Sequence, residues 1–395
     1  FFCWDNWLIL THILQNMNDL DFDLIRPYTF AEIQEAIPRI ISDDSFYLMM
    51  DYLFTEQEKD TVIANMKRAK TIHEFQVALT LPSVKSILAK TTNGISHSGF
   101  KNLTDENPNV FLANHRDIVL DSSILGAILT EADFKTPHIT WGSNLMVTPL
   151  IVDFGKSNQM ITVFREGSPK ELLQNSQRLS LFIRNSILDM KKPVWIAHSK
   201  GRSKNGFDKT DVSILKMLSL SGNSNFKNRF IELNLTPTTI SYEWEPCDAL
   251  KVREIYLSHD NTYVKEEDED FRSIIQGLIG DKGRVHISIG KPLNEEIMNY
   301  DNSGINNNEF VNLIANMVDK QIYHNYKLWP SNYLAYDLLN DSKEFEAEYT
   351  YETENIFESR FKKTIEITGI NNKKIREIFL MLYANPLINK LKNGS

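Results

Sequence analysis

Short β-branched runs alternate with helix-like stretches between about residues 105 and 295. The strand-like runs read NVFLAN, HITWGS, MITVF, PVWIAH, TTISYEW and RVHISIG. Such alternation is typical of βαβ units, in which a helix connects two parallel strands. We therefore predict an α/β fold with a mostly parallel central sheet flanked by helices.

The segments on either side of this region are predicted to be helical. TFAEIQEAIPRII, TEQEKDTVIANMKRA and TIHEFQVALTLPSVKSILAK place apolar residues at helical spacing, the first two behind a Thr that can cap the helix. Beyond a polar loop at 302–309 the chain turns helical again and ends in NNKKIREIFLMLYANPLINKLK. We expect a helical amino-terminal region (1–95), an α/β domain (96–300) and a helical carboxyl-terminal region (301–395).

Composition narrows the functional classes. The chain has 395 residues and a formal net charge of −9, so nucleic acid is not expected as a partner, because phosphate binding there needs a basic face. Its two cysteines, Cys3 and Cys247, form neither a disulfide framework nor a zinc pattern. No apolar run is long enough for a membrane span, and the first residues lack signal-peptide features and indicate an extension or interfacial segment. A cytoplasmic location is expected, with peripheral attachment to the inner face of the membrane left open.

Two tripeptides match motifs of protein kinases. His115-Arg116-Asp117 spells the catalytic-loop tripeptide, and Asp153-Phe154-Gly155 spells the metal-binding tripeptide. A kinase also needs a Gly-rich loop upstream and an Asn five residues after the catalytic Asp. The upstream glycines are only Gly94 and Gly99, and Ser122 stands at the Asn position, so the sequence argues against a kinase.

His115 has another interpretation, which comes from its position. It follows a predicted strand and precedes a predicted helix, where open α/β sheets bind their ligands. Asp117 and Asp121 follow closely, and an imidazole paired with a carboxylate is a general base suited to acyl transfer. The alternative is that His115 caps the helix and the acids only complement its dipole.

Cations gather after two other predicted strands. Arg165 ends MITVFRE, and the loop IAHSKGRSKNGFDKT carries Lys200, Arg202 and Lys204 around Gly201. Glycine lets the backbone approach a ligand, and cations near a helix start form an anion site. In an acidic protein this local density indicates a phosphate-binding site, and the alternative is a solvated charge cluster.

Taken in order, these segments resemble the phospholipid/glycerol acyltransferase family. NHRDIVLD is similar to the His-x4-Asp block, FGKSNQMITVFRE to the second block, SKGRSKNG to the Glu-Gly-x-Arg-Ser block, and LTPTTISYE to the Val-Pro-x-x-Ile-Ser-Tyr block. The likeness covers about residues 105 to 295. The ending Ile240-Ser241-Tyr242-Glu243 is closer to glycerol-3-phosphate and dihydroxyacetone-phosphate acyltransferases than to the lysophosphatidate-forming branch.

The resemblance implies a reaction and its participants. His115 would deprotonate an acceptor hydroxyl, which attacks the thioester of acyl-CoA or acyl-carrier protein. The second and third blocks would hold the phosphate of glycerol-3-phosphate or 1-acylglycerol-3-phosphate, and neither a metal nor a further cofactor is expected. The alternatives are a different lysolipid acceptor, or a degenerate domain that binds lipid phosphate without turnover.

The sequence departs from the family pattern at two positions. Asp121 arrives one residue later than the family spacing, and on a regular helix this would swing it away from the imidazole. Three arrangements would resolve this: a bulge in the helix restores the geometry, His115 lies before the helix, or Asp117 pairs with the imidazole in place of Asp121. We favour Asp121 as the partner. Lys200 stands where the family usually has Glu. The lysine adds a positive charge for binding phosphate but removes a hydrogen-bond acceptor for a hydroxyl, so the identity of the acyl acceptor is left open.

The carboxyl-terminal segment carries an apolar stripe. Ile375, Ile378, Phe379 and Leu382 share one helical face, with basic residues near its start. This pattern fits either docking to an anionic bilayer or packing against the catalytic domain.

Overall fold

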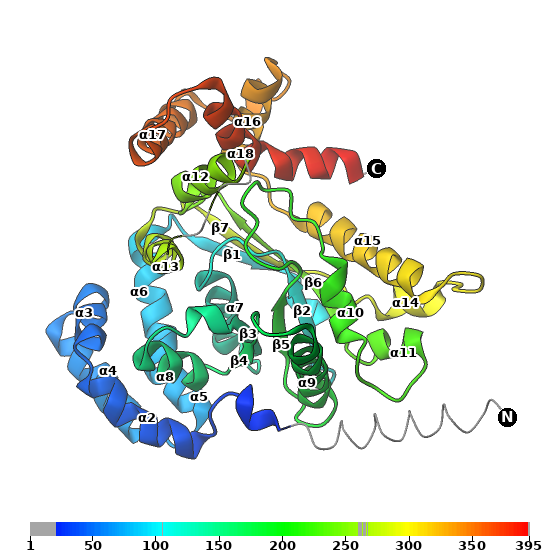
Figure 1. The fold of residues 1–395 in the computed structure, drawn as a ribbon. Coiled ribbons are helices and arrows are strands. Elements are labelled where there is room, and N and C mark those ends of the chain that lie inside the picture. The colour runs from blue at the N-terminus through cyan, green and yellow to red at the C-terminus, as the bar shows by residue number, and fades with distance from the viewer. Residues whose placement is uncertain (1–20, 105, 260–262, 264–265, 267, 394–395) are drawn as a thin grey trace.

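A seven-stranded sheet forms the centre of the computed structural model, which describes residues 21–104, 106–259, 263, 266 and 268–393 (Figure 1). The strand order is β1-β7-β6-β2-β5-β3-β4. The strands are β1 (Ile95–Ser98), β2 (Val110–Ala113), β3 (His138–Gly142), β4 (Met160–Val163), β5 (Val194–Ala197), β6 (Leu235–Tyr242) and β7 (Val285–Ile289). The predicted α/β class is confirmed, and β1 is the strand that sequence patterns missed.

Most neighbouring strands are parallel. β6, β2, β5, β3 and β4 run in one direction. β7 is antiparallel to β6, and β1 pairs with β7 in the parallel sense. The carboxyl ends of β2, β4, β5 and β6 therefore lie along one edge of the sheet. Loops that leave these ends can bring residues distant in sequence into one site.

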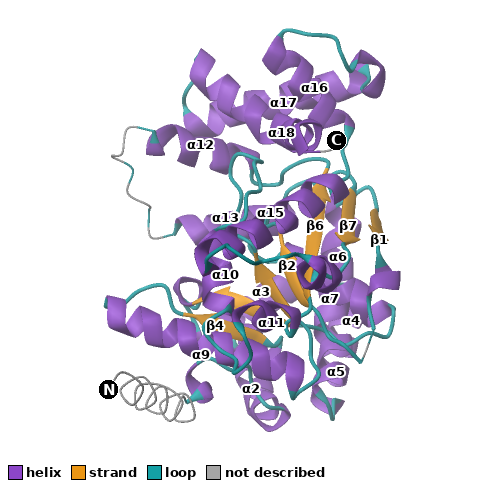
Figure 2. Cartoon of the chain, turned by 90° about the vertical axis from the view of Figure 1, so that its right-hand side faces the viewer, coloured by secondary structure: helices purple, strands orange, loops and turns teal. Residues whose placement is uncertain are grey.

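Side chains of the central strand β2 alternate between two apolar layers, as a strand requires. Val110 and Leu112 face one layer, and Phe111 and Ala113 face the other. The first layer is covered by α9 (Pro169–Leu188), α10 (Val212–Leu218), α11 (Phe226–Ile231), α14 (Asn294–Asn299) and α15 (Asn307–Asn325). The second is covered by α6 (Leu81–Thr91) and α7 (Leu120–Glu131), so helices flank both faces (Figure 2).

The amino-terminal helices form a cluster of their own. Thr29 and Thr55 form capping boxes at the starts of α2 and α4, as their sequences predict. Asp153, within α8, accepts hydrogen bonds from Arg39 and from the Tyr28 hydroxyl. The second kinase-like tripeptide thus lies in a helix and ties the amino-terminal cluster to the α/β domain. The elements here are η1 (Phe22–Leu24), α2 (Phe30–Ser42), α3 (Asp44–Leu53), α4 (Glu56–Arg68), α5 (Ile72–Phe75), the π-helical turn η2 (Gln76–Thr80) and α8 (Pro149–Ser157).

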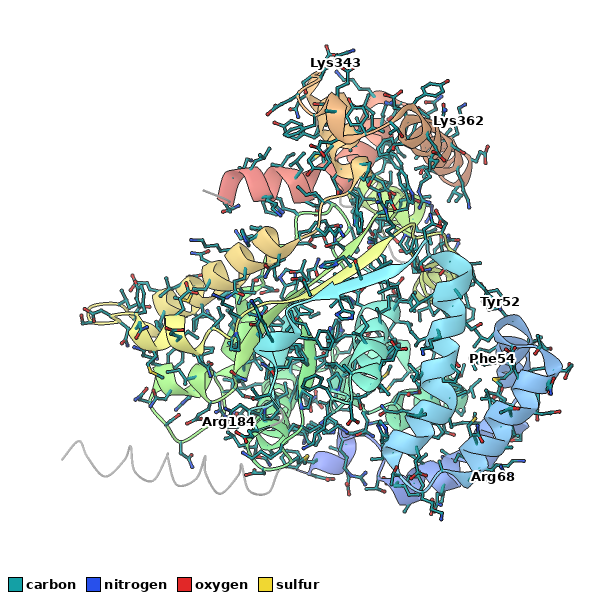
Figure 3. All side chains as sticks on the ribbon, turned by 180° about the vertical axis from the view of Figure 1, so that it is seen from behind. Tyr52, Phe54, Arg68, Arg184, Lys343 and Lys362 are labelled. Atoms are coloured by element: carbon teal, nitrogen blue, oxygen red, sulfur yellow. The ribbon has the colours of Figure 1, made fainter. Side chains whose placement is uncertain are left out.

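The carboxyl-terminal helices pack on α12 at the opposite end of the molecule from Arg68 (Figure 3). The predicted apolar stripe of α18 is buried in this cluster, so it packs within the protein and offers no free surface to a bilayer. The stripe consists of Ile375, Ile378, Phe379 and Leu382. The helices of this cluster are α12 (Asp248–Ser258), α16 (Pro330–Asn340), α17 (Tyr351–Thr368) and α18 (Lys373–Asn393). The remaining elements are α13 (Glu269–Ile279) and the short 3-10 turns η3 (Phe100–Asn102), η4 (Ser143–Leu145) and η5 (Glu346–Glu348).

Three further expectations have definite outcomes. The segment 302–309 is only partly a loop, because Asn306 caps α15 with its side chain and the helix begins at Asn307. The expected extension FFCWDNWLILTHIL, residues 1–14, lies outside the described residues. Within the described part of the chain, no helix is both long and apolar enough to span a membrane.

Candidate functional site

His115 and Asp121 meet at the carboxyl end of β2. His115 lies in the loop before α7, and Asp121 lies in the first turn of that helix. The imidazole Nδ1 is 2.8 Å from Asp121 Oδ2. The additional residue in the spacing is therefore absorbed by the loop, since His115 does not belong to the helix.

The Asp121 carboxylate is held by several donors. Oδ2 also accepts hydrogen bonds from the backbone N–H groups of Arg116 (2.6 Å) and Asp117 (3.0 Å), and Oδ1 accepts one from the Tyr242 hydroxyl (2.9 Å). With Nδ1–H donating to this carboxylate, the lone pair of the neutral imidazole is on Nε2. His115 Nε2 makes no hydrogen bond with a described residue, and this nitrogen is the one suited to accept a proton.

Asp117 has a different environment from Asp121. Its Oδ1 accepts hydrogen bonds from the backbone N–H groups of Val119 (3.0 Å) and Leu120 (2.8 Å), at the start of α7. Its Oδ2 is buried and accepts none from the described residues. Burial raises the pKa of the Asp117 carboxyl, and the nearby Asp121 charge adds to this rise. The geometry therefore brings Asp121, not Asp117, onto the imidazole.

Arg116 points into the protein. Its guanidinium is buried and contacts the carboxylates of Asp208 (2.5 Å) and Glu245 (2.8 Å). Glu245 also pairs with Lys251, and the Tyr326 ring lies 5.3 Å from the guanidinium carbon. This network connects the loops that follow β2, β5 and β6, so the middle residue of the kinase-like tripeptide is structural.

The predicted basic loop lies beside this pair. The backbone N–H of Ser203 donates to the carbonyl of His115 (2.7 Å), which joins the loop after β5 to the loop after β2. From α18, the side-chain amides of Asn385 and Asn389 donate to the carbonyls of Asn205 (2.7 Å) and Phe207 (2.8 Å). The carboxyl-terminal helix therefore supports the loop from behind.

Arg202 precedes Ser203 in this loop. Its Nη1 is buried and has no hydrogen-bond partner among the described residues. Its positive charge partly opposes the rise in the pKa of Asp117 that burial causes. Arg202 thus retains donors for an anion close to His115.

Arg165 reaches the same loop from β4. Its Nη1 donates to the carbonyl of Lys200 at 3.2 Å. To do so it crosses the end of β3 at Gly142, where a Cβ would lie 2.9 Å from Arg165 Nε. The same Cβ would lie 2.5 Å from Asn144 Oδ1, so a side chain at position 142 would make the side chains of Asn144 and Arg165 shift.

The two lysines of the predicted anion site lie near carboxylates. Lys200 is largely exposed, with its Nζ 3.6 Å from Asp211, and Lys204 pairs with Glu254 of α12. Gly201 has a φ of +149°, and its carbonyl accepts a hydrogen bond from the Ser199 hydroxyl (2.8 Å). Neither Arg165 nor Arg202 forms an ion pair with a described residue, so these two arginines offer the less neutralised charge.

Sequence reasoning missed the roles of Tyr242 and of the Arg116 network. Tyr242 ends the fourth block, TTISYE, so the pattern marked its position without indicating a contact with Asp121. Its signal was that a polar aromatic residue ends a strand at the same sheet edge as His115. Glu245 and Lys251 had no signal in the sequence. Among the described residues, no cluster of three or more His, Cys, Asp or Glu side chains is arranged to hold a metal ion.

No protein-family model matches the chain, and no curated protein matches it in sequence. Among solved structures, it is similar to the 1-acyl-sn-glycerophosphate (LPA) acyltransferase PlsC from Thermotoga maritima. That match has 11% identity and a TM-score of 0.35, and it covers 73% of this chain and 95% of PlsC. A likeness at this level assigns no activity, so function must be argued from the site.

Proposed function

We propose that this protein is an O-acyltransferase of glycerolipid metabolism. It moves a fatty acyl group from an acyl-CoA or acyl-carrier-protein thioester to a hydroxyl of glycerol-3-phosphate or 1-acylglycerol-3-phosphate. The observation that carries the proposal is the contact of 2.8 Å between His115 Nδ1 and Asp121, which leaves Nε2 without a partner among the described residues. The four sequence blocks that resemble the acyltransferase family support it.

In the proposed reaction, His115 is the general base. Nε2 accepts the proton of the acceptor hydroxyl as its oxygen attacks the thioester carbonyl carbon. The tetrahedral intermediate collapses with loss of the thiolate, which takes the proton back from the imidazolium. Asp121 holds the ring in the tautomer with the proton on Nδ1 and stabilises the imidazolium.

The arginines account for the choice of acceptor. Arg202 has an unpaired buried nitrogen near the His115–Asp121 pair, and Arg165 reaches the same loop. A guanidinium binds phosphate through two parallel hydrogen bonds, which orients the ligand as well as attracting it. In the proposal, Arg202 and Arg165 hold the acceptor phosphate, with Lys200, the Gly201 backbone and Lys204 contributing at the periphery.

A direct assay tests the proposal. Purified protein is incubated with radiolabelled oleoyl-CoA or oleoyl-carrier protein and with glycerol-3-phosphate, 1-oleoylglycerol-3-phosphate or 1-oleoylglycerol. We expect acylation of a phosphorylated acceptor, and His115→Ala should lower turnover by about 10²- to 10⁴-fold. His73→Ala, at an exposed histidine of α5, is the matched control and should retain activity.

Two results would overturn the assignment. A folded His115→Ala variant with normal turnover would remove His115 as the base. Phosphorylated lipid that binds without acyl transfer from either donor would indicate a lipid-binding domain instead of an enzyme.

A further inference from the structure

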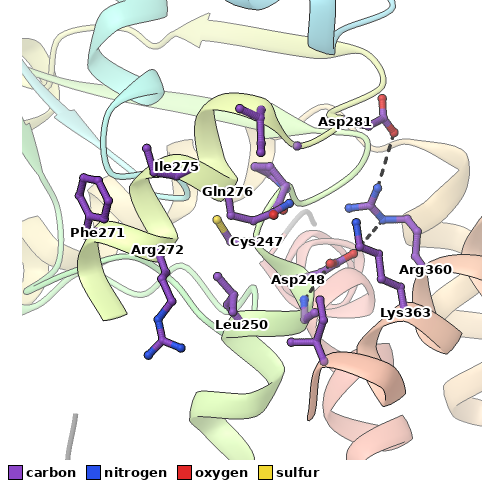
Figure 4. Close-up of a pocket in the computed structure, with 15 residues that line it drawn as sticks. Cys247, Asp248, Leu250, Phe271, Arg272, Ile275, Gln276, Asp281, Arg360 and Lys363 are labelled. Carbon is purple, nitrogen blue, oxygen red and sulfur yellow. Dashed lines mark hydrogen bonds and ion pairs between the residues drawn. The ribbon is translucent and has the colours of Figure 1, made fainter. Parts of the chain in front are cut away.

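A cavity of about 630 Å³ lies between α12, α13 and α17 (Figure 4). Its volume is in the range of about 300 to 1,000 Å³ that is typical of small-molecule sites. No residue assigned above to acyl transfer or phosphate binding lines it. Its apolar wall consists of Leu250, Phe271, Ile275, Ile279 and Ile367.

Helix α13 presents its large apolar side chains outward. Phe271, Ile275 and Ile279 recur every four residues and form one stripe, and they are 50%, 40% and 49% exposed. A surface helix normally turns such a stripe toward the core. This arrangement leaves an apolar stripe open toward the cavity.

The buried face of α13 explains this orientation. Ser273 and Gly277, which are small, face the α/β domain. A Cβ on Gly277 would lie 2.1 Å from Asp117 Oδ2, so the helix packs closely against the loop before α7. Because the small residues make this contact, the bulky residues of the same helix line the open cavity.

The charges at the rim select the kind of partner. Both lining acids, Asp248 and Asp281, are engaged by Arg360, at 2.8 and 3.5 Å. Lys363 lines the cavity and is exposed, and it forms no ion pair with a described residue. Arg272 lies beside Phe271 at the rim (Figure 4). Its guanidinium pairs with both Glu266 and Asp268. Lys363 is therefore the lining cation that forms no ion pair with a described residue.

We infer that this cavity binds an anionic lipid with a single acyl chain. The chain lies along the stripe of Phe271, Ile275 and Ile279, and the carboxylate or phosphate head group is bound by Lys363. The cavity is a concave groove between three helices, and this shape suits a single acyl chain better than it suits the flat surface of a bilayer. The inference goes beyond the proposed acyl transfer and does not depend on it, because the two sites share no assigned residue.

Calorimetric titration below the aggregation concentration of each lipid tests the inference. The probes are oleate, 1-oleoyl lysophosphatidate and the uncharged 1-oleoylglycerol. The lysophosphatidate titration uses the Arg202→Ala variant, so that the proposed acceptor site contributes little. We expect saturable binding of one anionic lipid per chain, and weaker binding of 1-oleoylglycerol. The relative affinities of oleate and lysophosphatidate identify the head group.

Paired variants locate the binding. Ile275→Asn should weaken oleate binding by about tenfold through lost apolar contact, and Lys363→Glu should weaken it through charge repulsion. The controls Leu338→Asn, at an exposed leucine of α16, and Lys362→Glu, at the neighbouring lysine outside the cavity, should bind as the parent does.

Four results would overturn the inference. They are the absence of oleate and lysophosphatidate binding, equal affinity in the cavity variants and their controls, and equal affinity for the uncharged lipid. The fourth is that dispersed lipid does not bind, while the parent protein either sediments with anionic vesicles or forms a concentration-dependent dimer and Ile275→Asn abolishes this association. In that case the stripe is a bilayer or self-association surface.

Discussion

The hydroxyl of Tyr242 lies 2.9 Å from Oδ1 of Asp121, the same carboxylate that contacts the His115 imidazole through Oδ2. Burial raises the pKa of Tyr242 well above its usual value of 10, and the charge of Asp121 adds to the rise. The hydroxyl therefore stays protonated at neutral pH and donates to the carboxylate. Strand β6 thus orients a residue of α7.

Tyr242→Phe tests this positioning role. The variant leaves Asp121 Oδ1 without its donor, so the carboxylate is held less firmly against the imidazole. We expect kcat to fall about tenfold, with little change in the acceptor KM. Tyr323→Phe also removes a buried hydroxyl, but one whose contact is the carbonyl of Phe207, and it serves as the control. Equal effects of the two variants on kcat would argue for a general packing defect.

The two carboxylates near His115 should respond differently to amide substitution. Asp121→Asn places an amide against Nδ1 and favours the wrong imidazole tautomer, so turnover should fall by about 10⁴-fold at most, the loss known for such a change in a catalytic triad. Asp117→Asn can keep the Oδ1 contacts with Val119 and Leu120, and turnover should change little. Steady-state rates of the two folded variants decide the matter. The opposite ranking would assign the pair to Asp117.

The phosphate-binding role of the arginines predicts a change in KM. Arg165→Ala and Arg202→Ala should each raise the acceptor KM by the equivalent of about 1.5 to 3 kcal/mol, because a charge-assisted contact is lost. The donor KM should change much less. Arg202→Lys should not restore affinity, since an ammonium lacks the planar fork.

Comparison with an unphosphorylated acceptor provides the control for these two variants. Acylation of 1-oleoylglycerol should be slow and nearly indifferent to both substitutions. Equal use of phosphorylated and unphosphorylated acceptors by the parent and both variants would show that the arginines do not bind phosphate.

Arg116 is predicted to matter for stability. Arg116→Met leaves the carboxylates of Asp208 and Glu245 without this partner in a buried region, at a cost of about 3 to 5 kcal/mol in the free energy of unfolding. Chemical denaturation measures the loss. Lys343→Met, which breaks an exposed pair with Glu346, should leave the free energy of unfolding nearly unchanged. Similar losses in both variants would contradict a structural role for the buried network.

His198 makes the stability of the fold dependent on pH. Burial lowers the pKa of His198 to about 4, from an ordinary value of 6.5. The folded protein therefore binds this proton less readily than the unfolded chain, and stability is lost as the pH falls from about 6.5 toward 4. Between pH 7 and pH 5 the loss from this residue should be about 2 kcal/mol.

Unfolding at the two pH values, in the parent and in His198→Asn, measures this contribution. The variant should lose less stability on acidification. Burial also lowers the pKa of His286 to about 4, so this residue contributes in the same pH range. The test is therefore the difference in pH dependence between the parent and His198→Asn. His73→Asn, at an exposed histidine, should keep the slope of the parent. An identical pH dependence for His198→Asn and the parent would exclude the effect.

Local patterns in the sequence were sufficient for most of the sheet and for the helix starts. The six predicted strands are present because each is a short run of apolar and β-branched residues, and Thr29 and Thr55 cap helices through contacts with nearby residues. β1 was missed because ISHS is short and polar, and it becomes a strand only by pairing with β7.

The sequence by itself placed His115 and two acids at the end of a strand, and the cations at the ends of two others. It did not decide which acid contacts the imidazole, because the number of residues between His115 and each acid does not determine which way their side chains point when part of the segment is a loop. The tertiary structure decided this: His115 lies outside α7, and Tyr242 and two backbone N–H groups hold Asp121 toward it. It also decided that Arg116 points inward and that Arg165 reaches the loop after β5. These contacts join residues far apart in the chain, and no local pattern specifies them because they depend on how the strands are ordered in the sheet.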